Sequence, residues 1–319
     1  MKNVKKKRVL LTGATGFVGR SIQKRLIADG DYKLTIATRR EVEVPDGGRI
    51  FKMAGLTAET DWSDILQTVD IVIHAAARAH VMKNEGGDAL TEYRKVNVEG
   101  TLQLARQAIQ TGVQRFVFIS SIGVNGNINK GAFAAEDTPN PADPYAQSKY
   151  EAEQALWELT ENTDMELVII RPPLVYGPNA PGNFGSLVHW IYKGIPLPLG
   201  AIHNKRSLVG LDNLVDLIII CIGHPAAANE VFLAADGESV STTELLRGVA
   251  KAMGRPARLF PIPAGLLQLG ATVLGKKAMA QRLLGSLQVD IRKNQQVLGW
   301  RPPFTLEQGL KRCFDDTTV

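Results

Sequence analysis

The sequence contains few cysteines and, late in the chain, no apolar run long enough to cross a bilayer. Its 319 residues include two cysteines, Cys221 and Cys313, both in apolar helical contexts and without metal-ligand spacing. A disulfide framework and a cysteine metal site are thereby excluded, and we expect core thiols of a reduced compartment and no metal. The longest late apolar stretch, 262–274, contains Gln268 and is too short for a membrane span.

The sequence shows neither a signal peptide nor a nucleic-acid-binding module. The basic start, 2–8, resembles the first region of a signal peptide, but Gly13 ends the apolar stretch too soon for its hydrophobic region. That start supplies much of the formal net charge of +5, and a mild basic bias suits an anionic small substrate. We expect a cytoplasmic protein with no nucleic-acid partner and no integral membrane segment.

One apolar segment near the end of the chain has two interpretations. Leu266, Leu267, Leu269, Val273 and the pair Lys276-Lys277 could make a peripheral membrane contact. We expect these apolar side chains to pack inside a lobe of the protein instead.

What is present is an ordinary globular composition in which strands and helices alternate. Hydrophobic residues make up 45% and charged residues 22% of the chain, enough for a large core or a core with a lobe. In the first half, short apolar runs alternate with helical stretches, which predicts a parallel sheet with helices on both faces. The predicted strands are 8–12, 33–38, 49–53, 70–75, 115–120 and 166–171, and the predicted helices are 20–29, 88–111 and 144–161.

The second half is less regular. Residues 177–205 predict loops around one helix, 186–192, whereas strand 207–211, helix 212–222 and strand 230–235 indicate a return to the sheet. Ser241 and Glu244 predict a capping box at the start of helix 241–253, and 290–298 and 305–313 close the chain. We expect an α/β fold, a Rossmann-like doubly wound parallel sheet with a smaller C-terminal substrate lobe. Residues 1–172 with return segment 206–235 would form the dinucleotide-binding domain, and 173–205 with 236–319 the substrate-binding lobe.

Three glycines, Gly13, Gly16 and Gly19, follow the first predicted strand and open the first helix. The first allows a sharp strand-to-helix turn, the second lets a phosphate approach the backbone, and the third packs the helix closely on the strand. The free N–H groups at the helix start then face a pyrophosphate. A plain glycine turn is the alternative, but the strand before it and the helix after it favour a dinucleotide site.

Tyr145 and Lys149 lie four residues apart in a predicted helix and therefore share one of its faces. The ordinary pKa of a phenol is about 10, and a nearby ammonium and a cationic nicotinamide both lower it toward neutrality. Lys149 can also hold the nicotinamide ribose. Ser121 lies past the carboxyl end of a predicted strand, and open α/β sheets bind ligands at the carboxyl ends of their strands. Ser121 would donate a hydrogen bond to the reacting oxygen. A surface pair is the alternative for this spacing alone.

These motifs together resemble an extended short-chain dehydrogenase/reductase of the NAD-dependent epimerase/dehydratase family. The matching segments span nearly the whole chain: Gly13/Gly16/Gly19, 74–77, 97–101, Ser120-Ser121, Tyr145/Lys149, 171–178 and 299–302. The resemblance implies a nicotinamide cofactor, UDP-linked nucleotide-sugar substrates, and Ser121, Tyr145 and Lys149 as the catalytic residues.

The resemblance also implies which residues bind each ligand. For the cofactor they are Gly13, Thr15, Gly16, Phe17, Val18, Gly19, Ala75, Ala76, Ala77, Tyr145, Lys149 and Pro173. Arg39 is added to the cofactor residues because of its place at the end of the second predicted strand. For the substrate they are His80, Ser121, Asn183 and Arg206, the last two at the diphosphate. We expect His74 to be a structural histidine and Asn97 to anchor a helix.

Two departures from the family pattern narrow the reaction. Ser121 is followed by Ile122 and Gly123 instead of the acidic residues that remove water in 4,6-dehydratases, so dehydration is not expected. An NAD enzyme usually carries an acidic residue at the end of the second strand, whereas this chain has Arg39 and Arg40 there. A cation in that place pairs with a 2′-phosphate, so NADP(H) is favoured over NAD(H). Two solvated loop arginines are the alternative.

Three functions follow from this pattern. The principal hypothesis is a 4-ketoreductase that passes hydride from NADPH to C4 of a UDP-4-keto-6-deoxy-hexosamine, with Tyr145 protonating O4, for N-acetylquinovosamine-type sugars of surface polysaccharide. A UDP-hexose 4-epimerase that keeps NAD bound uses the same residues and stays open. A non-catalytic cofactor-binding scaffold is disfavoured because Ser121, Tyr145 and Lys149 are all present. Helices 88–111 and 144–161 resemble the family's dimer-forming pair, so we expect a homodimer.

Overall fold

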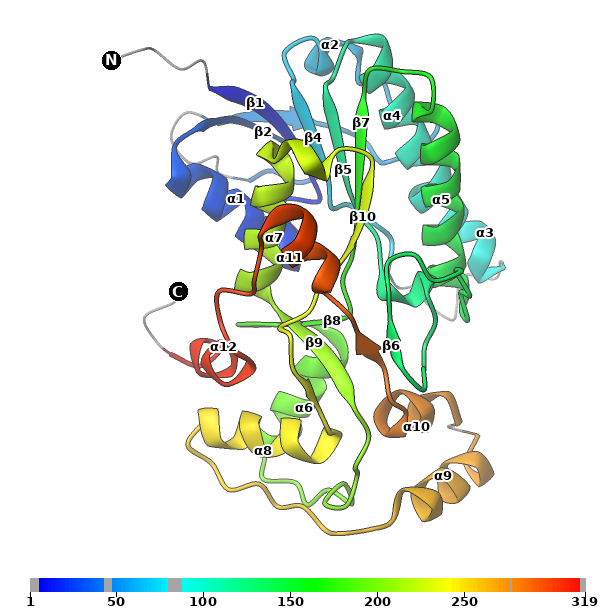
Figure 1. Cartoon of the computed structure of the whole chain (residues 1–319), viewed down its shortest axis with the longest axis vertical. Helices are drawn as coiled ribbons and strands as arrows, with labels where there is room; N and C mark the ends of the chain where they lie inside the picture. The colour runs from blue at the N-terminus through cyan, green and yellow to red at the C-terminus, as the bar shows by residue number, and fades with distance from the viewer. Residues whose placement is uncertain (1–5, 43–47, 80–87, 276, 316–319) are drawn as a thin grey trace.

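The computed structural model describes residues 6–42, 48–79, 88–275 and 277–315, and a parallel sheet of seven strands lies at its centre (Figure 1). The strands are β1 (Lys7–Thr12), β2 (Tyr32–Thr38), β3 (Arg49–Lys52), β4 (Ile71–His74), β5 (Arg115–Ile119), β7 (Glu166–Arg171) and β10 (Glu230–Leu233). Their order is β10-β7-β5-β4-β1-β2-β3, and every neighbouring pair is parallel. The chain adds strands on one side of β1 and then on the other, which places a ligand crevice at the carboxyl ends of β1 and β4. The predicted Rossmann-like α/β fold is confirmed.

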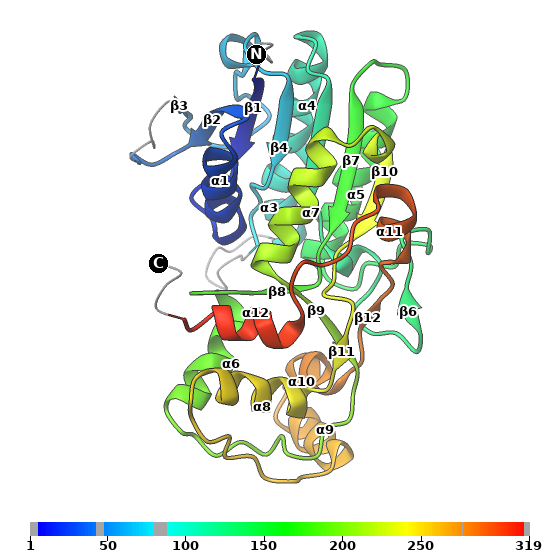
Figure 2. The same ribbon diagram turned by 60° about the vertical axis from the view of Figure 1, so that its left-hand side comes forward.

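Helices cover both faces of this sheet (Figure 2). They are α1 (Phe17–Asp29), α2 (Ser63–Leu66), α4 (Thr101–Gln110), α5 (Pro144–Thr160), α7 (Leu211–Gly223) and α11 (Arg292–Leu298). On one face, Ile22 of α1 and Leu214 of α7 are buried against the strands. On the other, Leu104 of α4 and Leu156 of α5 are buried in a second cluster. The sheet is therefore apolar on both faces, which explains why its strands were visible as short unbroken apolar runs.

The helical stretch predicted over 88–111 is present, but a π-helical turn interrupts its regular α-helical geometry. Its pieces are α3 (Ala89–Arg94), the π-helical turn η1 (Lys95–Gly100) and α4. The turn brings Gly100 against Leu56, where an added Cβ would lie 2.8 Å from the Leu56 carbonyl carbon. A π turn inserts one extra residue and re-aims the side chains around it, and it is frequent at functional sites.

A second group of elements is built mostly from the chain after Pro172-Pro173, together with β6 from before it. The strands are β8 (Leu174–Tyr176), β9 (Arg206–Gly210) and β11 (Ser239–Val240) in one small sheet, and β6 (Ala132–Phe133) and β12 (Gln288–Val289) in another. The helices are α6 (Gly182–Tyr192), α8 (Thr242–Ala252), α9 (Ala264–Val273), α10 (Lys277–Leu284) and α12 (Leu306–Arg312). The expected return of 207–211 to the large sheet is wrong, because β9 pairs with β8 and β11. The strand expected over 230–235 does join the large sheet, as β10 beside β7.

The apolar side chains of α9 are not packed as expected. Leu266, Leu269 and Val273 are 61%, 64% and 80% exposed, and none of the residues of α9 is buried. Leu267 alone of the four apolar residues named from the sequence contacts the core of the lobe. No helix in the described ranges has the length and apolar character needed to cross a membrane.

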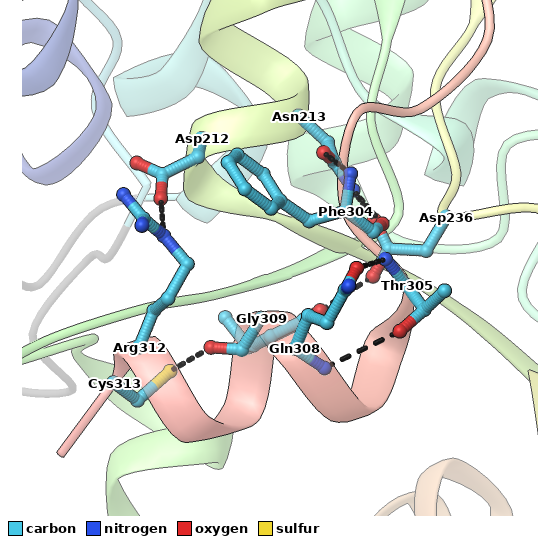
Figure 3. A network of polar contacts seen from close by, with 10 residues as sticks. Asp212, Asn213, Asp236, Phe304, Thr305, Gln308, Gly309, Arg312 and Cys313 are labelled. Atoms are coloured by element: carbon cyan, nitrogen blue, oxygen red, sulfur yellow. Dashed lines mark hydrogen bonds and ion pairs between the residues drawn. The ribbon is translucent and has the colours of Figure 1, made fainter. Parts of the chain in front are cut away.

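A buried polar network fastens the C-terminal helix to the rest of the molecule (Figure 3). The Asp236 carboxylate accepts hydrogen bonds from Tyr176 Oη at 2.6 Å, the Gly210 amide at 2.8 Å and Asn213 Nδ2 at 2.7 Å. Asn213 also donates to the Phe304 carbonyl at 2.8 Å and accepts from its amide at 3.0 Å. Burial raises the pKa of Asp236, and these hydrogen bonds oppose the increase. The network joins β8, β9, α7 and the segment before α12.

Candidate functional site

The glycine turn between β1 and α1 has no room for side chains. Gly13 has a φ of +73°, and a Cβ there would lie 2.6 Å from the Ala76 amide nitrogen. A Cβ on Gly19 would lie 2.1 Å from the Gly13 carbonyl oxygen. The turn therefore requires glycine at its first position for conformation and at its third for close packing, as the spacing predicted.

The first turn of α1 presents unpaired donors. Gly16 is the N-cap residue, no side chain caps the helix, and its first turn holds no acidic residue. The amide groups of Phe17 and Val18 are thus available to an anion at the positive end of the helix dipole. These features, with the glycine cradle, fit a dinucleotide diphosphate.

A cavity of about 550 Å³ opens beside this turn. It lies at the carboxyl ends of β1, β2 and β4, where the strand order of the sheet places a ligand crevice. Its walls are formed by Gly13, Thr15, Gly16, Ala37, Thr38, Arg39, Met53, Leu56, Ala75, Ala76, Ala77, Arg78 and Val96. Seven of the residues assigned to the cofactor from the sequence line it, whereas Met53, Leu56 and Val96 were not foreseen, because nothing in their local sequence marks them.

Arg39 is the basic side chain that borders the cavity at the end of β2. It is exposed, and among the residues the structure describes it forms no ion pair. The Thr38 hydroxyl is occupied locally, since it accepts from the Arg40 amide at 3.1 Å. The end of β2 therefore offers a cation to a bound ribose.

Tyr145 and Lys149 lie in the first two turns of α5. Asp143 caps this helix by accepting from the Ala146 amide at 2.9 Å, and Pro144 occupies its first turn. Lys149 is 1% exposed, and its ammonium lies 4.0 Å from the centre of the Phe118 ring. Burial lowers the pKa of Lys149 to about 7, and the Glu153 carboxylate opposes that decrease.

The pKa of Tyr145 departs from the expectation. Burial above all, and then Asp143 and Tyr93, raise the pKa of Tyr145 to about 12 in the chain by itself. The sequence analysis expected an ammonium and a cationic nicotinamide to lower this pKa together, and in the chain by itself Lys149 does not lower it, because Lys149 is desolvated and loses charge near neutrality. A cationic group bound beside the phenol is the remaining means of favouring the phenolate. Tyr93 meets the Tyr145 ring edge-on, with ring centres 5.8 Å apart.

Ser121 lies just past the carboxyl end of β5, as predicted. Its Oγ accepts from the Gly123 amide at 3.1 Å at the start of the 3₁₀ turn η2 (Ile122–Val124). That turn packs on α5, where a Cβ on Gly123 would lie 3.1 Å from Cβ of Ala146, the neighbour of Tyr145. The Ile122 amide donates to the Pro172 carbonyl at 2.9 Å, which joins the turn to the end of β7.

The sequence analysis missed a buried ionic cluster beneath these residues. Glu153 and Arg171 are 2% and 5% exposed, and Arg171 Nε donates to Glu153 Oε1 at 3.0 Å. The Ser120 hydroxyl donates to the same oxygen, and Arg171 Nη1 donates to Asn125 Oδ1 at 3.0 Å. The cluster connects the ends of β5 and β7 to α5. An acidic residue four positions after Lys149, on the buried face of the helix, was the available signal.

His74 and Asn97 have the structural roles that were expected. Both ring nitrogens of His74 are taken by threonine hydroxyls, Nδ1 by Thr12 at 2.8 Å and Nε2 by Thr101 at 2.9 Å. Burial, and then Lys149, lower the pKa of His74 to about 3. Asn97 donates to Ser148 Oγ at 3.0 Å and accepts from the Arg78 amide at 2.8 Å. Asn97 therefore connects the loop after β4 to α5, and both polar atoms of its side chain are used in these hydrogen bonds.

The residues assigned to the substrate are only partly located. His80 lies outside the described residues, and Asn183 is exposed in the first turn of α6. Arg206 Nη1 donates to the carbonyls of Arg282 at 2.8 Å and Gly285 at 3.1 Å, so part of its guanidinium is already bound. Pro173 is buried at the junction of β7 and β8. In the described part of the chain, no group of His, Cys, Asp and Glu side chains could hold a metal ion.

A model of the NAD dependent epimerase/dehydratase family matches residues 9–235, which include the glycine turn, the cavity and all three catalytic candidates. The chain belongs to this family. A UDP-glucose 4-epimerase of Vibrio cholerae is 48% identical over 309 residues, covering 96% of this chain and 94% of that protein. A second family relative, the N-acetyl-alpha-D-glucosaminyl-diphospho-ditrans,octacis-undecaprenol 4-epimerase of Escherichia coli O157:H7, is 28% identical and covers 95% of this chain and 93% of its own.

The family fold is also found among solved structures. A UDP-glucuronic acid 4-epimerase from Bacillus cereus in complex with NAD has a TM-score of 0.79 at 21% identity, covering 97% of each chain. A UDP-glucose 4-epimerase from Thermotoga maritima with UDP-glucose has a TM-score of 0.76 at 22% identity, covering 98% of this chain and 100% of that one. At these identities the likeness establishes the shared fold alone.

Proposed function

We propose that this chain is a UDP-hexose 4-epimerase that works with bound NAD. The observation that carries the proposal is the 48% identity to the Vibrio cholerae UDP-glucose 4-epimerase along 96% of this chain. Ser121, just past the end of β5, and Tyr145 and Lys149, both on α5, are all present. The ketoreductase and the epimerase use the same three residues, so these residues do not distinguish the two reactions. The similarity does, and it favours the epimerase over the ketoreductase that was the principal hypothesis from the sequence.

The side chains of the site can move the proton that epimerisation requires. Bound NAD supplies reversible hydride transfer at C4 of the sugar. The Tyr145 oxygen would accept the proton of the O4 hydroxyl when C4 is oxidised and would return this proton to O4 when C4 is reduced again. Ser121 would donate a hydrogen bond to O4 and Lys149 would hold the cofactor ribose, while the positive charge of the bound nicotinamide would favour the phenolate. Hydride and proton both return to the sugar, so no reductant is consumed.

A cofactor-release assay combined with a turnover assay tests this function. The purified protein is denatured, the released nucleotide is identified, and the native protein is incubated with UDP-glucose without added reductant. We expect NAD in the released fraction and formation of UDP-galactose, together with the reverse reaction. Failure to interconvert the two sugars or their N-acetylated counterparts, with NADPH-dependent reduction of a UDP-4-keto-6-deoxy sugar instead, would establish the ketoreductase.

The 4-ketoreductase for surface polysaccharide sugars remains the second candidate because of Arg39. Its guanidinium borders the cavity where a 2′-phosphate of NADP(H) would lie, and a reductase needs a cofactor that exchanges. If Arg39 pairs with that phosphate, Arg39→Asp should weaken NADPH binding by ~1.5–3 kcal/mol and NADH binding far less. The neighbouring Arg40→Asp is the matched control. Equal losses for both cofactors, measured by calorimetry, would make Arg39 a bystander.

We also propose that different parts of the chain bind the cofactor and the substrate, and that the protein forms a homodimer. Residues 1–172 with 206–235 would hold the cofactor, and 173–205 with 236–319 the sugar nucleotide, although β9 lies in the smaller sheet. A homodimer would form through the outer faces of α4 and α5, which lie together on one side of the large sheet (Figure 1). Sedimentation at micromolar concentration tests the assembly, and a monomer there would contradict it.

A further inference from the structure

Helix α9 exposes an apolar face that nothing in the described chain covers. Leu266, Leu269 and Val273 follow one another at three- and four-residue intervals, so they share a side of the helix, and each is more than half exposed. Leu274, directly after the helix, and Phe260, shortly before it, are 72% and 55% exposed. We call these five residues the apolar tip. Isolated exposed leucines are ordinary on protein surfaces, but a contiguous set on one short helix marks an interaction site.

The apolar tip lies at one end of the molecule. Both views place α9 at the end opposite the start of the large sheet, next to α10 (Figures 1 and 2). Leu267 points the other way and packs in the lobe core, which fixes the orientation of the helix. The segment before α9 is held by backbone pairing of Leu259 with Leu197 and of Pro263 with Ala201. The tip is thus a supported projection of the lobe and not a loose end.

Two long segments of the lobe around this tip carry only basic charges. No Asp or Glu occurs in 173–211 or in 245–289, and these two segments contain ten lysines and arginines. The rest of the chain carries 27 lysines and arginines against 32 acidic residues, so the positive charge of the protein is concentrated in this lobe. Arg255 and Arg258 precede α9 and are exposed, and Lys276 and Lys277 follow it in the sequence.

These charges decide between the possible occupants of the face. A second copy of the chain would bring two basic lobes together, and like charges disfavour that contact. An anionic bilayer complements both properties at once, because the apolar side chains enter the acyl boundary while the basic side chains meet lipid phosphates. We propose that the apolar tip docks this protein peripherally on an anionic lipid bilayer.

Vesicle binding of the full-length protein tests the docking independently of catalysis. The protein is floated with vesicles of phosphatidylcholine alone and of phosphatidylcholine mixed with phosphatidylglycerol, at low and high salt. We expect binding to the anionic vesicles, little binding to the neutral ones, and loss at high salt because screening weakens the basic contacts. The double variant Leu266→Asp/Leu269→Asp should lower the partition coefficient at least ~10-fold, since it removes the buried apolar contact.

Two further variants separate the apolar contribution to vesicle binding from the basic contribution. Ile50→Asp, on the exposed edge strand β3, is the apolar control and should bind like the wild type. Arg255→Gln/Arg258→Gln leaves the apolar tip intact and should weaken only the anionic binding, so it tests the proposal even if the leucine variant folds poorly. Equal binding to neutral and anionic vesicles, or an Ile50→Asp loss as large as that of the tip variant, would overturn the proposal. So would sedimentation showing that the tip variant dissociates a dimer, which would make the face a self-association surface.

Discussion

Lys149 is a basic side chain with almost no contact with water. It is 1% exposed, and burial lowers its pKa to about 7 despite the opposing Glu153 carboxylate. Groups of this kind persist in a fold when function needs them, because the charged form is penalised by the surrounding apolar atoms. The i, i+4 spacing predicted that Lys149 is a neighbour of Tyr145. It could not predict the pKa values, because these depend on burial that only the packed structure defines.

Replacing Lys149 should therefore stabilise the cofactor-free protein. Lys149 has a folded pKa of about 7 against an ordinary 10.5, so between these values the folded chain binds fewer protons, and stability rises with pH. The free energy of unfolding of Lys149→Met does not rise in this way. Its excess over the wild-type value is therefore largest below pH 7 and shrinks toward pH 10.5. We expect at least ~1 kcal/mol at neutral pH, about 2–4 °C in Tm. Urea unfolding at neutral and alkaline pH measures it.

The control for that experiment is Lys33→Met, on an exposed position of β2, which should change little at either pH. A Lys149→Met protein no more stable than the wild type at neutral pH would show that the ammonium is better solvated than its burial implies.

Tyr145 should be indispensable for turnover and dispensable for folding. Tyr145→Phe keeps the ring that packs against Tyr93 but removes the group that carries the proton, so kcat should fall by ~10²–10⁴. Cofactor retention and Tm should change little, because the glycine turn is untouched. The neighbouring Tyr93→Phe serves as the control and should keep most of the activity. Near wild-type turnover of UDP-glucose by Tyr145→Phe would disprove the proposed proton transfer.

At the scale of elements, Glu153 connects β5, β7 and α5, which position the proposed catalytic residues. Its carboxylate accepts from Ser120, beside Ser121 at the end of β5, and from Arg171 at the end of β7, while its own helix α5 carries Tyr145 and Lys149. A buried ion pair of this kind adds little net stability, but removal of one partner leaves an uncompensated charge.

Glu153→Gln should lower the free energy of unfolding by ~3–5 kcal/mol, because it leaves the Arg171 guanidinium buried without its counter-charge. The double variant Glu153→Gln/Arg171→Met should recover much of that loss, since both charges are then gone. Chemical denaturation measures the three proteins as a cycle with Arg171→Met. Equal stability of Glu153→Gln and the wild type would show that Arg171 finds other partners.

The elements that the sequence predicted well are those with one clear pattern. The buried strands of the large sheet are short apolar runs, and the box of Ser241 and Glu244 does begin α8. The π turn within 88–111 was invisible, because it arises from the close approach of Gly100 to Leu56, which is distant in sequence. β9 was assigned to the wrong sheet for the same reason: its apolar pattern suits either sheet, and only its partner β8 decides.

For the whole molecule, the site was predictable where a motif fixes it locally. The glycine turn, Ser121 and the Tyr145–Lys149 pair are each specified within a few residues. The cavity walls formed by Met53 and Leu56 and the cluster around Glu153 are assembled from separate segments by the sheet topology. The exposed face of α9 was also misjudged, because an apolar pattern alone does not say whether a partner covers it.

The integrity of the whole molecule depends on the contact of α12 with β8. A methyl group at Gly309 would lie 2.2 Å from Tyr176 Oη, and that hydroxyl holds the buried Asp236 at 2.6 Å. Gly309→Ala should therefore displace Tyr176, cost ~1–3 kcal/mol of unfolding free energy and loosen α12, so that trypsin cuts after Lys311 sooner. Gly223→Ala, at the end of α7 with nothing within 4 Å of an added Cβ, should not destabilise the protein. A Gly309→Ala protein that melts and resists trypsin like the wild type would show that α12 docks without this contact.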